Sequence, residues 1–139
     1  MKWYLSSKTK HKEKIISITK FLESKNEQVL STWIYVNDDI KPFSKNIEKV
    51  SILADKFVNE VLDADILVIF NDREGRDLYT EFGLALAKNH LGQEIKIYII
   101  GDDEASLMQR HPIVRHFKNI KEVFVFENIN SENFIFSDF

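Results

Sequence analysis

The run ADILVIF, residues 64–70, constrains the fold of this chain more than any other segment. Five consecutive apolar residues follow Asp65, so a strand formed by this run directs apolar side chains to both sides. A strand with one face in water alternates apolar and polar residues, whereas a strand inside a parallel sheet is covered on both faces. The run therefore predicts a central strand of a parallel sheet, with Asp65 ordering the point where the strand begins.

Four further segments have the composition and flanking residues of strands: residues 2–7, 28–36, 95–100 and 122–126. Between them, apolar residues recur at helical spacing. This spacing predicts helices over 12–25, 44–62 and 79–89, and a short helix over 111–117. Strands and helices therefore alternate along the chain.

This alternation predicts an α/β fold: a single-domain three-layer sandwich with a mostly parallel five-stranded sheet and helices on both faces, flavodoxin-like or Rossmann-like. Residues 1–139 are assigned to one domain, because the length suits one core and no repeat, low-complexity tract or linker interrupts it. Ligands bind such sheets beyond the carboxyl ends of the strands. A site is therefore expected among the loops 6–10, 36–43, 71–77 and 101–111.

Composition and missing motifs exclude several classes of protein. The net charge of −3 gives no basic field for a nucleic-acid polymer, and the absence of cysteine excludes disulfides and thiolate chemistry. The first twelve residues carry neither a signal-peptide pattern nor an apolar span, so we expect a cytoplasmic protein without membrane contact. Neither GxGxxG nor GxxxxGK(S/T) occurs, and the four histidines lack metal-ligand spacing. We therefore expect no cofactor and no metal.

The segment after the central strand carries the main functional signal. The loop NDREGRD, residues 71–77, leads into LYTEFGLALA, residues 78–87, with Glu81 in the first turns of the predicted helix. Together with WYLSS at residues 3–7, this strand–loop–helix unit resembles the nucleoside 2-deoxyribosyltransferase-like family, which overlaps with small TIR-like nucleotide-processing proteins. EFGLALA stands where the family has ELG-x-A. Gly75 lies two residues before the family's loop glycine, and Asp77 occupies that position.

The resemblance implies that Glu81 attacks the anomeric carbon of a ribose or deoxyribose and that a nucleobase leaves. A carboxylate near a helix N-terminus is expected to stay charged, because the helix dipole and free amides favour that form. Gly83 is expected to permit close packing of the helix on the sheet. Relatives often carry a second acid, which Asp55 or Asp77 is predicted to supply here. Without the resemblance, Glu81 would be interpreted as an exposed glutamate that helps the helix to start.

Substrate-binding residues are predicted from the same loops and from neighbouring aromatics. Guanidinium and ammonium groups can bind a phosphate, a tyrosine can hydrogen-bond the carboxylate or the sugar, and an indole can stack on a base. The predicted set is Ser6, Ser7, Lys8, Trp33, Asp72, Arg73, Gly75, Arg76 and Tyr79. The alternatives are that the loop charges pair with one another in solvent and that Trp33 packs in the core.

These residues lead to one main hypothesis, which is cleavage or transfer of the N-glycosidic bond of a nucleoside or nucleoside 5'-monophosphate through a glutamate nucleophile. Two alternatives stay open: a TIR-like hydrolase of NAD or an NAD-derived signal, and a non-catalytic nucleotide-binding module. The expected partner is a small-molecule nucleoside or nucleotide. A homo-oligomer is also expected, with the tail aromatics Phe134, Phe136 and Phe139 covering an interface.

Overall fold

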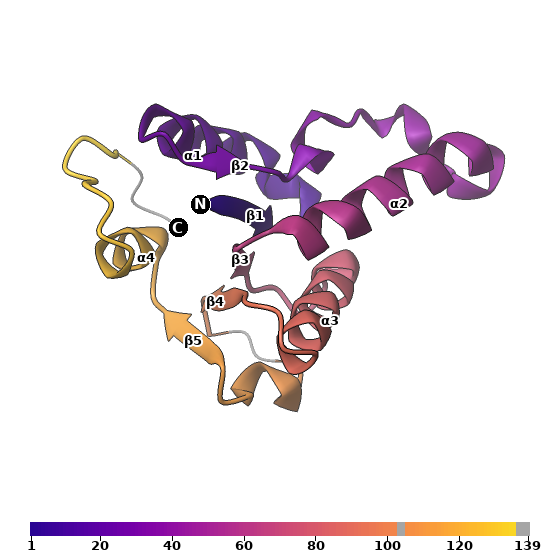
Figure 1. The fold of residues 1–139 in the computed structure, drawn as a ribbon. Helices are drawn as coiled ribbons and strands as arrows, with labels where there is room; N and C mark the ends of the chain where they lie inside the picture. Colours follow the sequence, from indigo (N-terminus) through magenta and orange to yellow (C-terminus); the bar gives the residue numbers. More distant parts are fainter. Residues whose placement is uncertain (103–104, 136–139) are drawn as a thin grey trace.

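The computed structural model describes residues 1–102 and 105–135 (Figure 1). Within them, five strands form one sheet in the order β2-β1-β3-β4-β5, and every neighbouring pair is parallel. The strands are β1 (Lys2–Ser6), β2 (Gln28–Val29), β3 (Ile66–Phe70), β4 (Lys96–Ile100) and β5 (Val114–Phe117). The α-helices of these residues are α1 (Lys12–Ser24), α2 (Ile47–Asp63), α3 (Arg76–His90) and α4 (Ile120–Phe126). The predicted α/β fold is confirmed, with a sheet that is entirely parallel.

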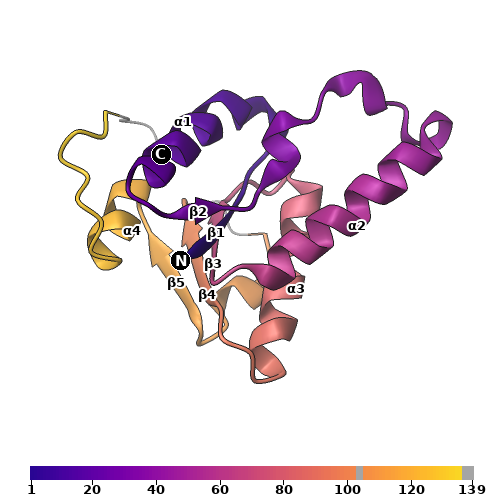
Figure 2. The same cartoon turned by 45° about the horizontal axis from the view of Figure 1, so that its top comes forward.

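Helices cover both faces of the sheet (Figures 1 and 2). An apolar layer lies between the sheet and the helices on each face. Successive side chains of β3 enter opposite layers, as the pleat of a strand requires. Ile66, Val68 and Phe70 pack with α1 and α4, whereas Leu67 and Ile69 pack with α2 and α3. All five are buried. The central strand is therefore covered on both faces, as its sequence predicts.

The predicted strand over residues 28–36 is wrong for most of its length. Only Gln28–Val29 pairs with β1, and Thr32–Tyr35 forms a short 3-10 helix. Side chains from this segment bind the backbone groups that a longer ladder would use. Ser31 Oγ accepts a hydrogen bond from the Leu5 N–H (3.1 Å), and the Trp33 indole N–H donates to the Leu5 carbonyl (2.8 Å). The segment thus stays beside β1 without continuing as a strand.

The last two elements were predicted as a helix followed by a strand, whereas the structure has a strand followed by a helix. Residues 114–117, inside the predicted short helix, form β5, because they pair in register with β4 from Ile97↔Val114 to Ile100↔Phe117. Residues 122–126, predicted as a strand, belong to α4. A reciprocal cap starts this helix: Asn119 Oδ1 accepts from the Glu122 N–H (3.1 Å), and Glu122 Oε2 accepts from the Lys118 N–H (2.8 Å).

Phe134 does not cover an intermolecular surface in this structure. It is buried in the apolar layer beneath α1 and α4, with its ring centroid 4.7 Å from that of Phe21 and 5.3 Å from that of Phe124. The prediction that it lies at an interface is therefore wrong. Phe136 and Phe139 lie outside the described residues.

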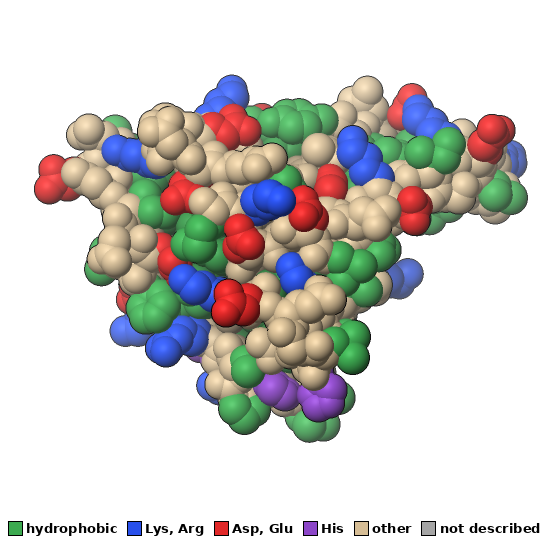
Figure 3. Space-filling model, viewed as in Figure 1, with side chains coloured by type: hydrophobic (Ala, Val, Ile, Leu, Met, Phe, Trp, Pro, Cys, Tyr) green, Lys and Arg blue, Asp and Glu red, His purple; other side chains and the backbone are tan. Residues whose placement is uncertain are grey.

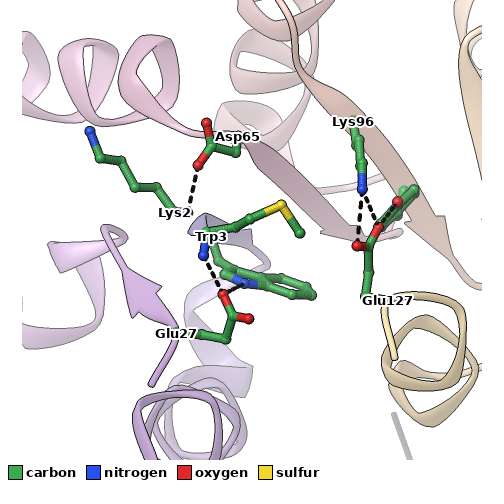
Figure 4. Close-up of polar contacts among 8 residues, drawn as sticks. Lys2, Trp3, Glu27, Asp65, Lys96 and Glu127 are labelled. Carbon is green, nitrogen blue, oxygen red and sulfur yellow. Dashed lines mark hydrogen bonds and ion pairs between the residues drawn. The ribbon is translucent and has the colours of Figure 1, made fainter. Parts of the chain in front are cut away.

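Three carboxylates hold the amino-terminal end of the sheet together (Figure 4). Asp65, Glu27 and Glu127 bind, in that order, the Lys2 backbone N–H (2.8 Å), the Trp3 indole N–H (3.0 Å) and the Lys96 ammonium (3.0 Å). The Tyr98 hydroxyl also hydrogen-bonds Glu127. The ordering role expected of Asp65 is confirmed. The contacts at this end of the sheet stabilise the fold.

Candidate active site

Glu81 lies in the second turn of α3, on the side of the sheet that α2 and α3 cover. Its side chain is half-buried, and its Oε2 is shielded from solvent without a hydrogen-bond partner among the described residues. Buried polar atoms in folded proteins are nearly always paired, so an unpaired one calls for an explanation. The alternative of a solvated first-turn glutamate does not describe this side chain.

Two hydroxyl groups of β1 face the Glu81 carboxyl. Tyr4 and Ser6 are buried and are two residues apart on one strand, so they share the face that α3 covers. Their hydroxyl oxygens, like Glu81 Oε2, are shielded and lack a hydrogen-bond partner in the described part of the chain. Both hydroxyls influence the Glu81 carboxyl, which places the three groups near one another, although none of these three atoms has a hydrogen-bond partner of normal geometry among the described residues.

Burial raises the pKa of Glu81 from 4.5 to about 8. The nearby hydroxyls of Ser6 and Tyr4 lower this pKa, because they stabilise the charged form, but burial outweighs them. The negative charges of Asp77 and Glu60 raise the pKa further. The helix N-terminus was expected to keep Glu81 charged, whereas the folded protein holds it mainly protonated at neutral pH.

Glu60 of α2 is an acid near Glu81 that the sequence analysis missed. Its carboxylate accepts hydrogen bonds from the backbone N–H (3.1 Å) and the hydroxyl (2.6 Å) of Thr32, which fix its position. Asp55, the acid predicted on this helix, is exposed and accepts a hydrogen bond from Asn59 (3.3 Å). The available signal for Glu60 was its spacing of three residues from Phe57, an apolar residue of the same helix, which places both on one face.

The loop between β3 and α3 is held by its own backbone and by one aspartate. Asp72 accepts hydrogen bonds from the N–H groups of Glu74 (3.0 Å) and Gly75 (2.9 Å), through its side chain and its carbonyl. Gly75 caps α3, and a Cβ there would lie 2.1 Å from Leu78 Cδ2 and 3.2 Å from the Asp72 carbonyl oxygen. The loop glycine, although displaced from the family position, therefore stands where any larger residue would collide with Leu78.

The lysine predicted to bind phosphate is engaged with this loop. Lys8 Nζ lies 2.9 Å from Glu74 and 3.8 Å from Asp72, and Lys10 lies 3.8 Å from Asp72. The hydrogen bond to Glu74 raises the pKa of Lys8. Arg73, Arg76 and Asp77 are exposed where α3 begins. Positive and negative side chains are also interspersed over the face shown in Figure 3, without a field of one sign.

The remaining predicted residues lie near the same edge in different roles. Trp33 is half-buried, donates to the Leu5 carbonyl and packs against both apolar layers, so its contacts here are those of core packing. Tyr79 packs on the layer beneath α2 and α3, and the Ser7 hydroxyl donates to the Lys8 carbonyl (3.3 Å). Gly83 is exposed, and a Cβ there would meet nothing within 4 Å. The close packing expected of Gly83 is therefore wrong.

A second polar group that the sequence analysis missed lies at the ends of β3 and β4. Asn71 directly follows β3, and its Oδ1 accepts a hydrogen bond from Nε2 of the fully buried Gln109 (2.8 Å). Asn71 Nδ2 is shielded and has no hydrogen-bond partner among the described residues. The position of Asn71, immediately after the central strand, was the available signal.

Two hollows of the surface lie away from Glu81. One, of about 460 Å³, is at the start of α2; the other, of about 280 Å³, is lined by Tyr98, Arg115 and Phe126. Neither is lined by Glu81, whose side chain is half-buried. No group of three potential metal-ligating side chains was found among the described residues.

The fold and this site define a class: a parallel five-stranded α/β domain with an ionisable carboxyl group on the helix that follows the central strand. A solved structure of this fold is the CMP N-glycosidase BcmB of Clostridium botulinum. It matches 93% of this chain and 100% of its own chain, with a TM-score of 0.57 and 16% sequence identity. The match confirms the predicted resemblance at the level of the fold. No family model matches the chain, and no curated protein matches its sequence.

Within the part of the chain that the structure describes, no helix has the length and apolar character needed to cross a membrane.

Proposed function

We propose that this protein cleaves the N-glycosidic bond of a nucleoside 5'-monophosphate or nucleoside, with Glu81 as the nucleophile. The observation that carries the proposal is Oε2 of the half-buried Glu81, which has no hydrogen-bond partner among the described residues and lies near the hydroxyls of Tyr4 and Ser6. Strongly shifted pKa values and unpaired buried polar atoms are concentrated at functional sites. The fold shared with a CMP N-glycosidase supports the same reaction class and makes CMP the first substrate to test.

In this reaction a Glu81 carboxylate oxygen forms a bond to the anomeric carbon as the carbon–nitrogen bond to the base breaks. The electron pair of the broken bond leaves with the base, which takes up a proton. Water then attacks the anomeric carbon, breaks its bond to the Glu81 oxygen and loses a proton, which balances the proton that the base takes up. The sugar and the carboxylate are released. The hydroxyls of Ser6 and Tyr4 can hydrogen-bond the carboxylate or the sugar. Part of the Glu81 side chain reaches solvent, and a pentose would approach from that side.

Glu81 must lose its proton before it can attack. With a pKa of about 8, Glu81 is ionised in roughly a tenth of the molecules at pH 7. We therefore expect kcat/KM to rise with pH up to about 8 and then to level off. The positive charge that develops on the oxocarbenium-like sugar in the transition state favours the ionised carboxylate, so Glu81 stabilises the transition state more than the bound substrate.

Release of free base from a panel of nucleotides, followed by chromatography, tests the proposal. The panel contains CMP, the other nucleoside monophosphates, the corresponding nucleosides and NAD, so that release of nicotinamide would identify an NAD hydrolase instead. Glu81→Gln should abolish release, whereas Glu94→Gln, a change of an exposed glutamate in the loop between α3 and β4, should leave it unchanged. Equal rates in the wild type and Glu81→Gln would overturn the role of Glu81.

The protonated state of Glu81 also supports a second candidate, a nucleotide-binding module without turnover. A neutral carboxyl group donates one hydrogen bond and accepts others, which suits a sugar hydroxyl. Calorimetry would then show nucleotide binding in both the wild type and Glu81→Gln, with no release of base at pH 8 or above. Turnover at any pH excludes this candidate.

A further inference from the structure

The amide groups of Asn71 and Gln109 are oriented by a chain of hydrogen bonds. The Ala105 backbone N–H, which can only donate, is bound by Gln109 Oε1 (3.3 Å). Gln109 Nε2 is therefore turned toward Asn71 and donates to its Oδ1 (2.8 Å). Since Oδ1 is the acceptor, Nδ2 is the remaining group of Asn71, and an amide nitrogen can only donate. The group left at the end of this series of hydrogen bonds, Asn71 Nδ2, is therefore a donor.

Gln109 itself is held rigidly. Its side chain is 0% exposed, its backbone N–H donates to the Ser106 carbonyl (3.2 Å), and its carbonyl oxygen lies 2.8 Å from His116 Nε2 on β5. The Asn71 N–H continues the β3–β4 ladder by donating to the Ile100 carbonyl (2.8 Å). Backbone and side chain of Asn71 are thus both fixed, so its Nδ2 cannot turn to solvent without breaking the bond to Gln109.

The Asn71 donor shares a face of the sheet with Glu81. Leu67 and Ile69 of β3 point toward α2 and α3, and Asn71 is the next residue in this alternation. Ile69 is paired with Ser6, so Asn71 is diagonally placed relative to Ser6, farther toward the carboxyl end of the sheet. Asn71 Nδ2, Ser6 Oγ and Glu81 Oε2 are all shielded and have no hydrogen-bond partner among the described residues.

The chemistry of this donor indicates what it binds. An uncharged amide suits a neutral acceptor better than a phosphate, which is favoured by guanidinium or ammonium groups. The ammonium groups near this edge, on Lys8 and Lys10, are engaged by Asp72 and Glu74. A Glu81 oxygen that attacks the anomeric carbon approaches opposite the leaving base, so the base lies on the side of the sugar away from α3. A base on that side can reach the carboxyl end of β3, where Asn71 lies. The acceptors there are the carbonyl oxygen or ring nitrogen beside the glycosidic nitrogen.

We propose that Asn71 Nδ2 donates a hydrogen bond to this acceptor of the nucleobase and that Gln109 is the residue that positions it. The inference rests on the proposed function, because it assumes that a nucleotide occupies the Glu81 site. As the carbon–nitrogen bond breaks, its electron pair moves onto the base, and negative charge grows on the acceptor. A fixed donor at that atom stabilises the transition state more than the bound substrate. Asn71 therefore contributes to kcat as well as to KM.

Two variants of Asn71 test the donor. Asn71→Asp keeps the acceptor for Gln109 and removes the N–H group, and Asn71→Ala removes the donor without adding a charge near Glu81. Each should lower kcat/KM for base release by about tenfold or more, while Asn133→Asp, a change of an exposed asparagine, leaves it unchanged. Gln109→Glu keeps the acceptor for Ala105 but loses the donor to Asn71, so it should lower kcat/KM in the same direction.

A substrate analogue separates this role from a merely structural one. In an analogue whose base lacks the acceptor beside the glycosidic nitrogen, such as a 3-deazapurine nucleotide for a purine substrate, the wild type and the Asn71 variants should react at similar rates. Calorimetry with unmodified nucleotides in the Glu81→Gln background measures binding without turnover. There, Asn71→Ala should weaken binding several-fold.

The outcomes distinguish this inference from the proposed function. Base release that is equal in the wild type and both Asn71 variants overturns the inference and leaves the function intact. A loss that is as large with the analogue as with the natural base also overturns it. Nucleotide binding that depends on Asn71, without any base release, supports the inference and overturns the proposed reaction. If the wild type neither binds nor cleaves any nucleotide of the panel, both are overturned.

Discussion

Replacing Glu81 by glutamine is expected to stabilise the protein, and the gain is expected to grow with pH. Burial raises the pKa of Glu81 to about 8, from 4.5. Between these two values the carboxyl group keeps its proton in the folded protein and loses it in the unfolded chain. Unfolding then releases a proton, so the free energy of unfolding of the wild type falls as the pH rises through this window. Glutamine has no proton to lose.

The size of the effect follows from the shift. One pKa unit corresponds to about 1.36 kcal/mol, so the whole shift is worth at most about 5 kcal/mol above pH 8. Glu81 is partly exposed, and solvent screening reduces this figure. We expect a gain of about 1–3 kcal/mol at pH 8 and a small fraction of it at pH 5.

Urea unfolding from pH 5 to pH 9 measures this gain, with the free energy extrapolated to water at each pH. Because a glutamine side chain can also form new hydrogen bonds, the slope of the gain against pH is the decisive quantity, and its value at one pH is not. Glu94→Gln, which changes an exposed glutamate, should show no comparable slope. A gain that stays constant from pH 5 to pH 9, or a loss that deepens as the pH rises, would refute a raised pKa for Glu81.

Three other substitutions test neighbouring features. Gly75→Ala should lower the thermal midpoint, at a cost of about 1–3 kcal/mol, because the new Cβ would lie 2.1 Å from Cδ2 of the buried Leu78; an unchanged midpoint would show that Leu78 moves aside freely. Gly83→Ala should raise the midpoint by the equivalent of about 0.5–1 kcal/mol, since the added methyl group meets nothing within 4 Å, and calorimetry that finds a loss would contradict this open environment. Glu60→Gln keeps an acceptor for Thr32 but removes a negative charge near Glu81. The pKa of Glu81 should therefore fall, and kcat/KM should begin to rise at lower pH. A pH profile identical to that of the wild type would show that Glu60 does not influence the pKa of Glu81.

The sheet could be predicted because its central strands carry their own signal. An apolar run such as Ile66–Phe70 is compatible with burial on both faces, and the intervening segments repeat at helical spacing. The short segments near the C-terminus carried weaker signals. Val123 and Phe124 favour strands by propensity, whereas the capping residues Asn119 and Glu122 decide for a helix. The capping pair was visible in the sequence; the ladder that makes Val114–Phe117 a strand was not, because it depends on β4.

The candidate site was predictable in its position and less so in its electrostatics. The strand–loop–helix pattern placed Glu81 beside the carboxyl ends of the strands, where the structure has it. Its raised pKa depends on burial and on Tyr4 and Glu60, which approach only after three separate elements pack. The position of Asn71 after the central strand was visible in the sequence, but the orientation of its amide depends on Gln109, which is distant from it in the sequence. Local sequence patterns predict where strands and helices lie. The protonation state of an ionisable group depends on residues that come from elsewhere in the chain.

Strand β1 spans both edges of the molecule in five residues. At one end Lys2 is tied to Asp65, and at the other Ser6 faces Glu81. A slip of one residue between β1 and β3 would turn Tyr4 and Ser6 to the opposite layer and would break the anchor at Asp65 at the same time. A substitution that removes the Asp65–Lys2 hydrogen bond should therefore lower the rate of the proposed reaction without changing the reacting groups. The rate of base release would then also report whether β1 and β3 are paired in the correct register.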